Sequence, residues 1–242
     1  MAKADSGEKG GGLPVVDIFL GSLIALICGL DRVAALQLMV SRPIVAAPLV
    51  GWLLGQPEVG LQVGLLVELL WLSRLPVGAV IPPDDTQVSI AATVLAIGLA
   101  TTTGFQGIGF VLLCLLVAIP FGKCGQFFDR YARTCNGGSL RRADSALAAG
   151  NFAVAEHQHL LGLCRFAVAA LATYLAIILG GGLLVPLLAP ILLSGLERSA
   201  GWLQVALPLV GVAVILGTIN VSRALTLFAA SFGMAFLLMW LV

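Results

Sequence analysis

Long apolar stretches separated by short polar or Gly/Pro-rich connections dominate this chain. The apolar segments run approximately over residues 14–30, 33–55, 59–72, 87–104, 106–122, 160–179, 183–196, 202–219 and 224–242. Three regions contain no charged residue, namely residues 86–122, 166–196 and 199–222. Because about 20 apolar residues suffice to cross the hydrocarbon core as a helix, this pattern predicts membrane-spanning helices.

Not every apolar segment is suited to a full span. Residues 59–72 are short and flanked by Pro57 and Pro76, and residues 183–196 follow three glycines and contain Pro186 and Pro190. Short, Gly/Pro-interrupted hydrophobic segments are typical of broken helices at a transporter's binding site. The stretches are also too long and too uniformly apolar for the strands of a barrel. We therefore expect an all-α, polytopic helical membrane protein with about seven full spans plus Gly/Pro-interrupted re-entrant hairpin segments.

Composition agrees with this class. Of 242 residues, 60% are hydrophobic and 10% charged, and the mean hydropathy is +1.07. An ordinary soluble domain carries roughly a quarter charged residues, so no large soluble domain fits. The net charge of +1 gives no reason to expect nucleic acid as a partner.

The distribution of polar residues predicts four regions. Residues 1–12 are polar and Gly-rich, and we expect a disordered N-terminal tail there rather than a signal peptide. Residues 13–122 form an N-terminal membrane half, with a re-entrant hairpin at 59–87 as its candidate binding site. Residues 123–159 form a basic loop, and residues 160–242 form the C-terminal membrane half.

The basic loop sets the expected orientation. It carries five basic residues, Lys123, Arg130, Arg133, Arg141 and Arg142. Because cytoplasmic loops carry an excess of Lys and Arg, we place this loop in the cytoplasm. Within it, residues 142–149 predict a short surface helix that ends at Gly150-Asn151, and a second helix is expected to start near Phe152.

Two pairs of glycines are spaced for close helix packing. Gly51 and Gly55 form one small-xxx-small pair, and Gly60 and Gly64 form another. Such pairs let two helix backbones approach closely in lipid. We expect packing to be their main role.

Glu68 is the most informative polar residue, because it lies inside the apolar run 63–72. Placing an acidic side chain at the bilayer centre costs on the order of 3 kcal/mol, so Glu68 must face protein, water or a ligand. It could pair with an arginine such as Arg42 or Arg74, or be a protonated carboxyl bonded to a neighbouring helix. Alternatively, a carboxylate could accept hydrogen bonds from two adjacent hydroxyls and so hold a sugar.

Asp84, Asp85 and Gln87 follow Pro82-Pro83 at the start of an apolar segment. An aspartate three residues before a glutamine matches a capping arrangement at a helix N-terminus. Such an end also offers N–H groups and the positive end of the helix dipole, so one aspartate can cap while the other faces a ligand.

Other polar residues carry weaker signals. Arg42-Pro43 marks a kink or a helix boundary with a charge beside it. His157 and His159 are two residues apart and point to different helix faces, so we expect no metal site. Asn220 is interpreted as a helix-to-helix contact. No nucleophile motif or phosphate loop is present, and we expect neither a catalytic residue nor a cofactor.

An ordered set of motifs resembles a known family. The segments are 41–51, 60–64, Glu68-Leu69-Leu70-Trp71, and 76–85 with its Pro82-Pro83-Asp84-Asp85 end. They are similar to the enzyme IIC component of the mannose/fructose/sorbose family of the phosphoenolpyruvate-dependent sugar phosphotransferase system. The likeness extends over residues 13–242 and is strongest from 29 to 104.

The resemblance implies a permease subunit in the cytoplasmic (inner) membrane of a bacterium. Such a subunit translocates a hexose-type sugar beside a second membrane subunit, enzyme IID, while cytoplasmic enzymes IIA and IIB bring the phosphoryl group. The chain would then be no enzyme by itself, and His157 and His159 would not be phosphorylated. Membrane lipid is a further expected partner, and we expect an oligomer.

The resemblance also assigns a site. Glu68, Asp84 and Asp85 would line the sugar path, and Gln87 and Arg42 complete the predicted substrate-binding set. Two alternatives remain open at this point. One is a scaffold or regulatory membrane subunit that conducts nothing. The other is an ion-coupled secondary transporter in which the carboxylates carry protons.

Overall fold

The computed structural model describes residues 13–72, 81–218 and 224–241, and all regular structure in these residues is helical. The seven described helices are α1 (Val15–Val33), α2 (Pro43–Leu53), α3 (Pro57–Leu70), α4 (Asp85–Thr103), α5 (Ile108–Ala148), α6 (Phe152–Thr218) and α7 (Ala224–Leu241). The expected all-α class is therefore confirmed. The predicted tail at 1–12, Arg74 and Asn220 lie outside the described residues.

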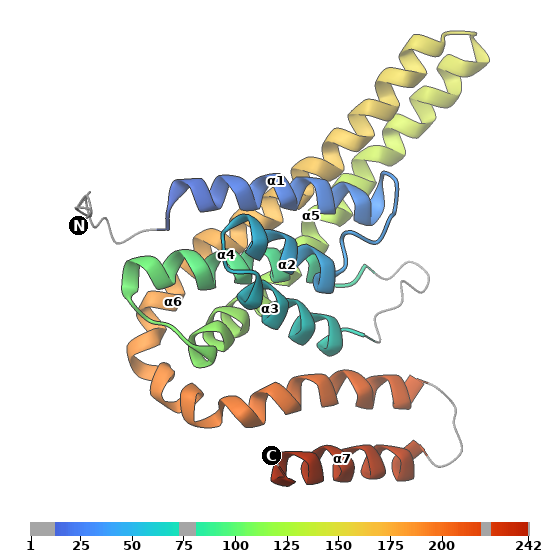
Figure 1. The fold of residues 1–242 in the computed structure, drawn as a ribbon. Coiled ribbons are helices and arrows are strands. Elements are labelled where there is room, and N and C mark those ends of the chain that lie inside the picture. Colours follow the sequence, from blue (N-terminus) through green and yellow to red (C-terminus); the bar gives the residue numbers. More distant parts are fainter. Residues whose placement is uncertain (1–12, 73–80, 219–223, 242) are drawn as a thin grey trace, which may run out of the picture.

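Helix α4 lies at the centre of the helical core. Its residues from Thr86 to Leu99 are all buried, and α1, α2, α3, α5 and α6 all contact it (Figure 1). The buried polar groups bond mostly to backbone: the Thr93 hydroxyl donates to Ser89 O at 2.8 Å. Because protein surrounds α4 on every side, this helix needs no apolar stripe facing lipid. Helix α4 is therefore the central element of the core.

Helices α2 and α3 form a hairpin of two short helices. Their 11 and 14 residues extend about 16 and 21 Å, less than the roughly 30 Å hydrocarbon core. A Cβ added at Gly51 would lie 2.7 Å from Gln56 O, and one at Gly64 would lie 2.6 Å from Pro43 O. The predicted close packing is confirmed for these glycines and for Gly60. Gly55 instead has φ of 76° and forms the turn.

The start of the α2–α3 hairpin divides an apolar segment that the sequence predicted as continuous. The apolar segment 33–55 is not one span, because α1 ends at Val33 and the chain is not helical again until Pro43. Proline disfavours the helical conformation at the residue before it, and Arg42 is extended with ψ of 135°. The connection is fixed by Asp31, whose carboxylate accepts from Leu38 N at 2.7 Å and Ser41 N at 3.0 Å.

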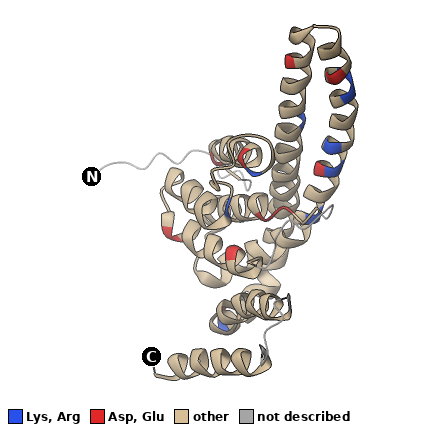
Figure 2. Cartoon of the chain, turned by 90° about the vertical axis from the view of Figure 1, so that its right-hand side faces the viewer, with Lys and Arg blue, Asp and Glu red and all other residues tan. Residues whose placement is uncertain are grey.

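Helices α5 and α6 form a long antiparallel hairpin, and the end of it that carries the α5–α6 turn projects beyond the other helices (Figure 1). The predicted turn at Gly150, with φ of 73°, and the helix start at Phe152 are confirmed. The predicted short surface helix is wrong, because α5 runs without a break from Ile108 to Ala148. The basic region is therefore helical, and its charges follow this projecting hairpin (Figure 2).

Helix α6 joins three predicted apolar segments into one element. Its 67 residues would extend about 100 Å if straight, and it contains Pro186, Pro190 and Pro208. Figure 1 shows that it changes direction below the core. Interior prolines remove backbone hydrogen bonds and bend helices, which is consistent with this path.

Three of the described helices are long and apolar enough to cross a membrane, namely Asp85–Thr103, Ile108–Ala148 and Phe152–Gly217. The chain is thus a multi-pass helical membrane protein. The predicted number of about seven full spans is not confirmed by these helices.

Candidate functional site

The N-terminus of α4 is held in place by Asp84. Its carboxylate accepts from Gln87 N at 3.0 Å, which confirms the predicted cap, and its own N–H donates to Gly122 O at 2.9 Å. A Cβ added at Gly125 would lie only 2.5 Å from Asp84 Cβ. Two glycines of α5 therefore make room for the start of α4.

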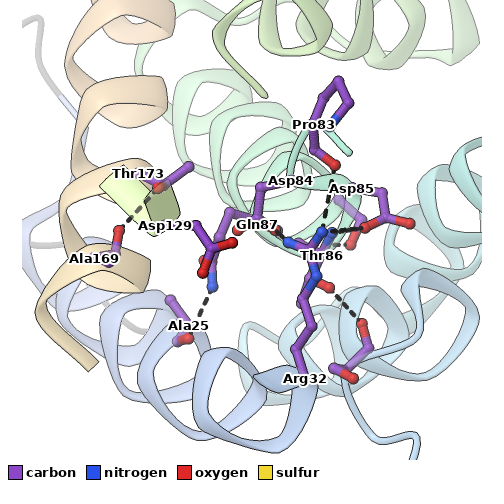
Figure 3. Close-up of polar contacts among 12 residues, drawn as sticks. Ala25, Arg32, Pro83, Asp84, Asp85, Thr86, Gln87, Asp129, Ala169 and Thr173 are labelled. Atoms are coloured by element: carbon purple, nitrogen blue, oxygen red, sulfur yellow. Dashed lines mark hydrogen bonds and ion pairs between the residues drawn. The ribbon is translucent and has the colours of Figure 1, made fainter. Parts of the chain in front are cut away.

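Arg32 of α1 contacts several polar groups at the N-terminus of α4 (Figure 3). Its Nη1 lies 2.5 Å from Asp84 Oδ1, and its Nη2 lies 3.6 Å from Asp85 Oδ1 and 3.4 Å from Pro83 O. The three side chains are between 12% and 23% exposed, so the cluster is mostly shielded from bulk solvent. The sequence prediction missed Arg32, although a charged pair, Asp31-Arg32, closing an apolar segment was an available signal.

A second ion pair joins Arg42 to Glu68 at the start of the α2–α3 hairpin. Glu68 Oε2 also accepts from Ile44 N at 3.5 Å, and the Glu68 side chain is 9% exposed. The carboxylate thus lies at the N-terminus of α2, where the helix dipole favours negative charge. Of the two arginines the sequence left open, the structure pairs Arg42 with Glu68.

A cavity of about 480 Å³ opens between these two ion pairs. We call it the charged cavity. Its charged and hydroxyl-bearing lining residues are Arg32, Ser41, Arg42, Asp84, Asp85, Thr86, Asp129, Arg133 and Thr173. This lining contains three arginines and three aspartates, so their formal charges cancel. The Asp129–Arg133 pair, 2.8 Å apart, is a third ion pair at its wall.

The predicted site residues divide into two groups. Arg42, Asp84 and Asp85 line the charged cavity, whereas Glu68 and Gln87 are not among its lining residues. Gln87 is fully buried, and its Nε2 donates to Ala25 O at 2.9 Å. Within the described residues, Gln87 Oε1 has no hydrogen-bond partner.

The lining favours a neutral ligand rich in hydroxyls. Carboxylates accept and guanidinium groups donate strong hydrogen bonds, and a balanced lining has no surplus positive charge to attract an anion. A volume of about 480 Å³ falls within the usual range for small-molecule sites. Among the described residues, no group of three or more His, Cys, Asp or Glu side chains is arranged to hold a metal.

Two solved structures share the fold of this chain. One, described as a membrane protein, has a TM-score of 0.59 and 25% identity, covering 95% of this chain and 97% of the other. The other is a cryo-EM structure of a mannose transporter in complex with a microcin, with a TM-score of 0.58 and 23% identity. It covers 93% of this chain and 87% of that one, and its likeness shows the fold alone.

Sequence relatives identify the family. The chain is 27% identical over 225 residues to the sorbose-specific EIIC component of Klebsiella pneumoniae, covering 91% of this chain and 79% of that protein. It is 29% identical to the mannose-specific EIIC component of Escherichia coli, covering 62% of this chain and 53% of that one. It is 32% identical to the fructose permease IIC component of Bacillus subtilis, covering 61% and 52%. The chain thus spans about half the length of these last two relatives. A family model described as the PTS system sorbose-specific IIC component matches residues 15–241, and the chain therefore belongs to the sorbose-type IIC family of the phosphotransferase system.

Proposed function

We propose that this IIC protein binds a neutral hexose-type sugar in the charged cavity and carries it across the bacterial inner membrane. The observation that supports this is the cavity itself: about 480 Å³, lined by paired arginines and aspartates, inside a chain of apolar helices. The relatives are named for sorbose, mannose and fructose, and all three of these sugars are hexoses. Ionic side chains are retained in such surroundings where they line a substrate path.

Each residue of the cavity has a distinct role in this proposal. Asp85 and Asp84 Oδ2, for which the described residues provide no bond, accept hydrogen bonds from sugar hydroxyls, because Asp84 Oδ1 already takes the bonds from Arg32 and Gln87 N. Arg42 donates to a sugar oxygen from the opposite wall. Arg32 positions both aspartates, and Glu68 positions Arg42. Gln87 ties α4 to Ala25 of α1 beneath the site.

The phosphoryl chemistry belongs to other proteins in this scheme. Enzyme IID is the second membrane subunit, and enzymes IIA and IIB deliver the phosphoryl group to the sugar as it leaves on the cytoplasmic side. The sugar phosphate then carries negative charge, and the balanced lining of the cavity has no surplus positive charge to attract it back.

The decisive experiment replaces Asp85 by Asn in the complex with its IID partner and measures binding of labelled hexoses and amino sugars. Asp85 is preferable to Asp84, which also caps α4. Loss of a charged hydrogen bond costs about 1.5 to 3 kcal/mol, so binding is expected to weaken roughly 10- to 100-fold. The control is Glu58→Gln, a matched change at an exposed carboxylate outside the cavity. Unchanged binding in Asp85→Asn would rule out the site.

The energy source separates the transport alternatives. Uptake that requires phosphoenolpyruvate and the IIA and IIB enzymes supports the proposal, whereas uptake driven by a proton gradient supports an ion-coupled transporter. A scaffold subunit would show no sugar binding in liposomes that hold the chain with IID. One preparation of the wild-type chain with IID can be used for the phosphoenolpyruvate-dependent uptake, the proton-driven uptake and the sugar-binding measurements.

A further inference from the structure

The connection between α1 and α2, residues 34–42, has an unusual backbone. Leu36, Gln37 and Met39 have φ of 57°, 53° and 62°, and in the described part of the chain no other residue except glycine has a positive φ. The left-handed conformation crowds the Cβ atom against the backbone, so it persists only where the surrounding structure imposes it. We call residues 34–42 the strained connection.

Side-chain packing does not impose this conformation. The side chains of Leu36, Leu38 and Met39 are 84%, 66% and 72% exposed, so they have little contact with the helices. Backbone bonds within the segment are of short range, such as that from Gln37 N to Ala35 O at 2.6 Å. The strained connection must therefore be held mainly by polar contacts from outside it.

Asp31, in the last turn of α1, provides the strongest of these contacts. It is 7% exposed, and each of its carboxylate oxygens accepts a backbone N–H of the strained connection. Oδ1 accepts from Leu38 N at 2.7 Å, and Oδ2 accepts from Ser41 N at 3.0 Å. Bonds to an ionised acceptor are stronger than neutral ones. On the other side, the Thr86 hydroxyl of α4 donates to Ser41 O at 2.8 Å.

The strained connection leads directly into the wall of the charged cavity. Ser41 and Arg42 line that cavity, whereas Asp31 is not among its lining residues. Arg42 N donates to Met39 O at 3.1 Å, so the left-handed residue Met39 helps to set where Arg42 begins. Asp31 already uses both oxygens on backbone N–H groups, and it reaches the cavity only through the backbone that it holds.

We propose that Asp31 is a positioning residue for sugar binding. By holding the strained connection, it places Ser41 and Arg42 in the wall of the charged cavity, and the sugar does not contact Asp31 itself. This inference rests on the proposed function of the charged cavity. It adds a residue outside the cavity whose effect on binding passes through the backbone rather than through a contact with the ligand.

The main test replaces Asp31 by Asn in the complex with IID and measures equilibrium binding of labelled hexoses. The amide sets an NH₂ group against a backbone N–H, so a part of the molecules loses the shape of the connection. Because apparent affinity falls with the fraction of competent molecules, we expect binding roughly 5- to 20-fold weaker. The double variant Asp31→Asn with Arg42→Gln should bind within about twofold of Arg42→Gln alone, since Asp31 acts through Arg42.

Glycine rescue distinguishes positioning from direct contact. In the Asp31→Asn background, Met39→Gly should tighten binding about fivefold, because glycine adopts the left-handed conformation without strain. Leu38→Gly is the matched control, since it removes a similarly exposed apolar side chain from the neighbouring residue, which is not left-handed. It should give no recovery. Absence of rescue by Met39→Gly would overturn the positioning role, as expected if Asp31 itself bound the sugar.

A milder pair of variants keeps the test informative if Asp31→Asn does not assemble with IID. Met39→Val places a β-branched side chain at a left-handed position, where it is especially unfavourable. It should weaken binding about threefold or more, and Leu38→Val should bind within about twofold of wild type. Equal binding by these two variants contradicts the inference.

The outcomes also separate this inference from the proposed function. If Asp85→Asn and Arg42→Gln weaken sugar binding while the Asp31 and Met39 variants bind like wild type, only the positioning role of Asp31 is wrong. Absent sugar binding by the wild-type chain with IID contradicts both the charged cavity and the role of Asp31.

Discussion

Helices α4 and α7 are both apolar helices of nearly equal length, 19 and 18 residues, yet they lie in opposite surroundings. Almost the whole of α4 is buried within the protein. In α7 the large apolar side chains are exposed, with Leu225 and Trp240 both 81% accessible. Figure 1 shows α4 enclosed by other helices and α7 at the edge of the molecule beside the end of α6.

Polar residues are what distinguish the two helices. Helix α4 carries Gln87, Ser89 and Thr93 in buried positions, and each has a hydrogen bond to backbone. Helix α7 has no charged residue, and its polar residues Thr226 and Ser231 are exposed rather than buried. Lipid tails are as apolar as leucine, so α7 needs no protein cover, whereas the amide of Gln87 does. In this chain, buried polar side chains within an apolar helix mark the helix that builds the site.

The largest expected effect comes from the same substitution made in both helices. Leu95→Ala in α4 removes a fully buried side chain that packs on Gly181 and leaves a cavity, which we expect to lower the free energy of unfolding by roughly 3 kcal/mol. Leu237→Ala in α7 affects a side chain that is 54% exposed and should cost less than about 1 kcal/mol. Denaturant titration in detergent micelles measures both. Equal losses would contradict the contrast between the helices.

The next effect concerns the ion pair at the start of α4. Arg32→Gln leaves Asp84 and Asp85 without their guanidinium in a mostly shielded place, and we expect a loss of about 2 kcal/mol, less than for a fully buried pair. Arg198→Gln is the matched control, because this exposed arginine bonds, among the described residues, to Ser194 O on its own helix. The double variant Arg32→Gln with Asp84→Asn should lose less free energy of unfolding than the sum of the losses in the two single variants. Strict additivity would show that the pair contributes no coupling.

The smallest effect sharpens the role of polar groups in α4. Gln87→Met keeps the side-chain length, removes the bond to Ala25 O and also removes the unpaired Oε1, so the two changes partly offset. We expect a loss of about 1 kcal/mol or less by thermal unfolding in micelles. Thr226→Val, at an exposed position of α7, serves as the comparison and should change little. A loss well above that of Leu95→Ala would mean that Gln87 holds more of the fold than its single bond indicates.

Local features of the site followed from the sequence. The cap at Asp84 depends on residues three positions apart, and the turn at Gly150 depends on one residue with a left-handed conformation, so short-range chemistry is sufficient for both. The length of the helix that precedes this turn was underestimated, because α5 is continuous from Ile108 to Ala148. Polar residues on the projecting hairpin were interpreted as a loop, although a helix can continue into water with charges on its surface.

The pairing of the charged residues around the cavity did not follow from the sequence. Arg42 and Glu68 are 26 residues apart, and either arginine near Glu68 satisfied the same electrostatic requirement. Arg32 escaped prediction because its partners lie on a different helix. The packing of α1 against α4 brings them together, and no pattern along the chain encodes that distance.

By itself the sequence determined that this protein is a helical membrane protein. Its long charge-free stretches can satisfy their backbone polar groups in lipid only as helices. The tertiary structure alone decided which helix is enclosed and which carboxylate meets which guanidinium around the charged cavity. The physical reason is range. Backbone hydrogen bonds and caps act within a few residues, whereas ion pairs and cavities arise where distant helices pack.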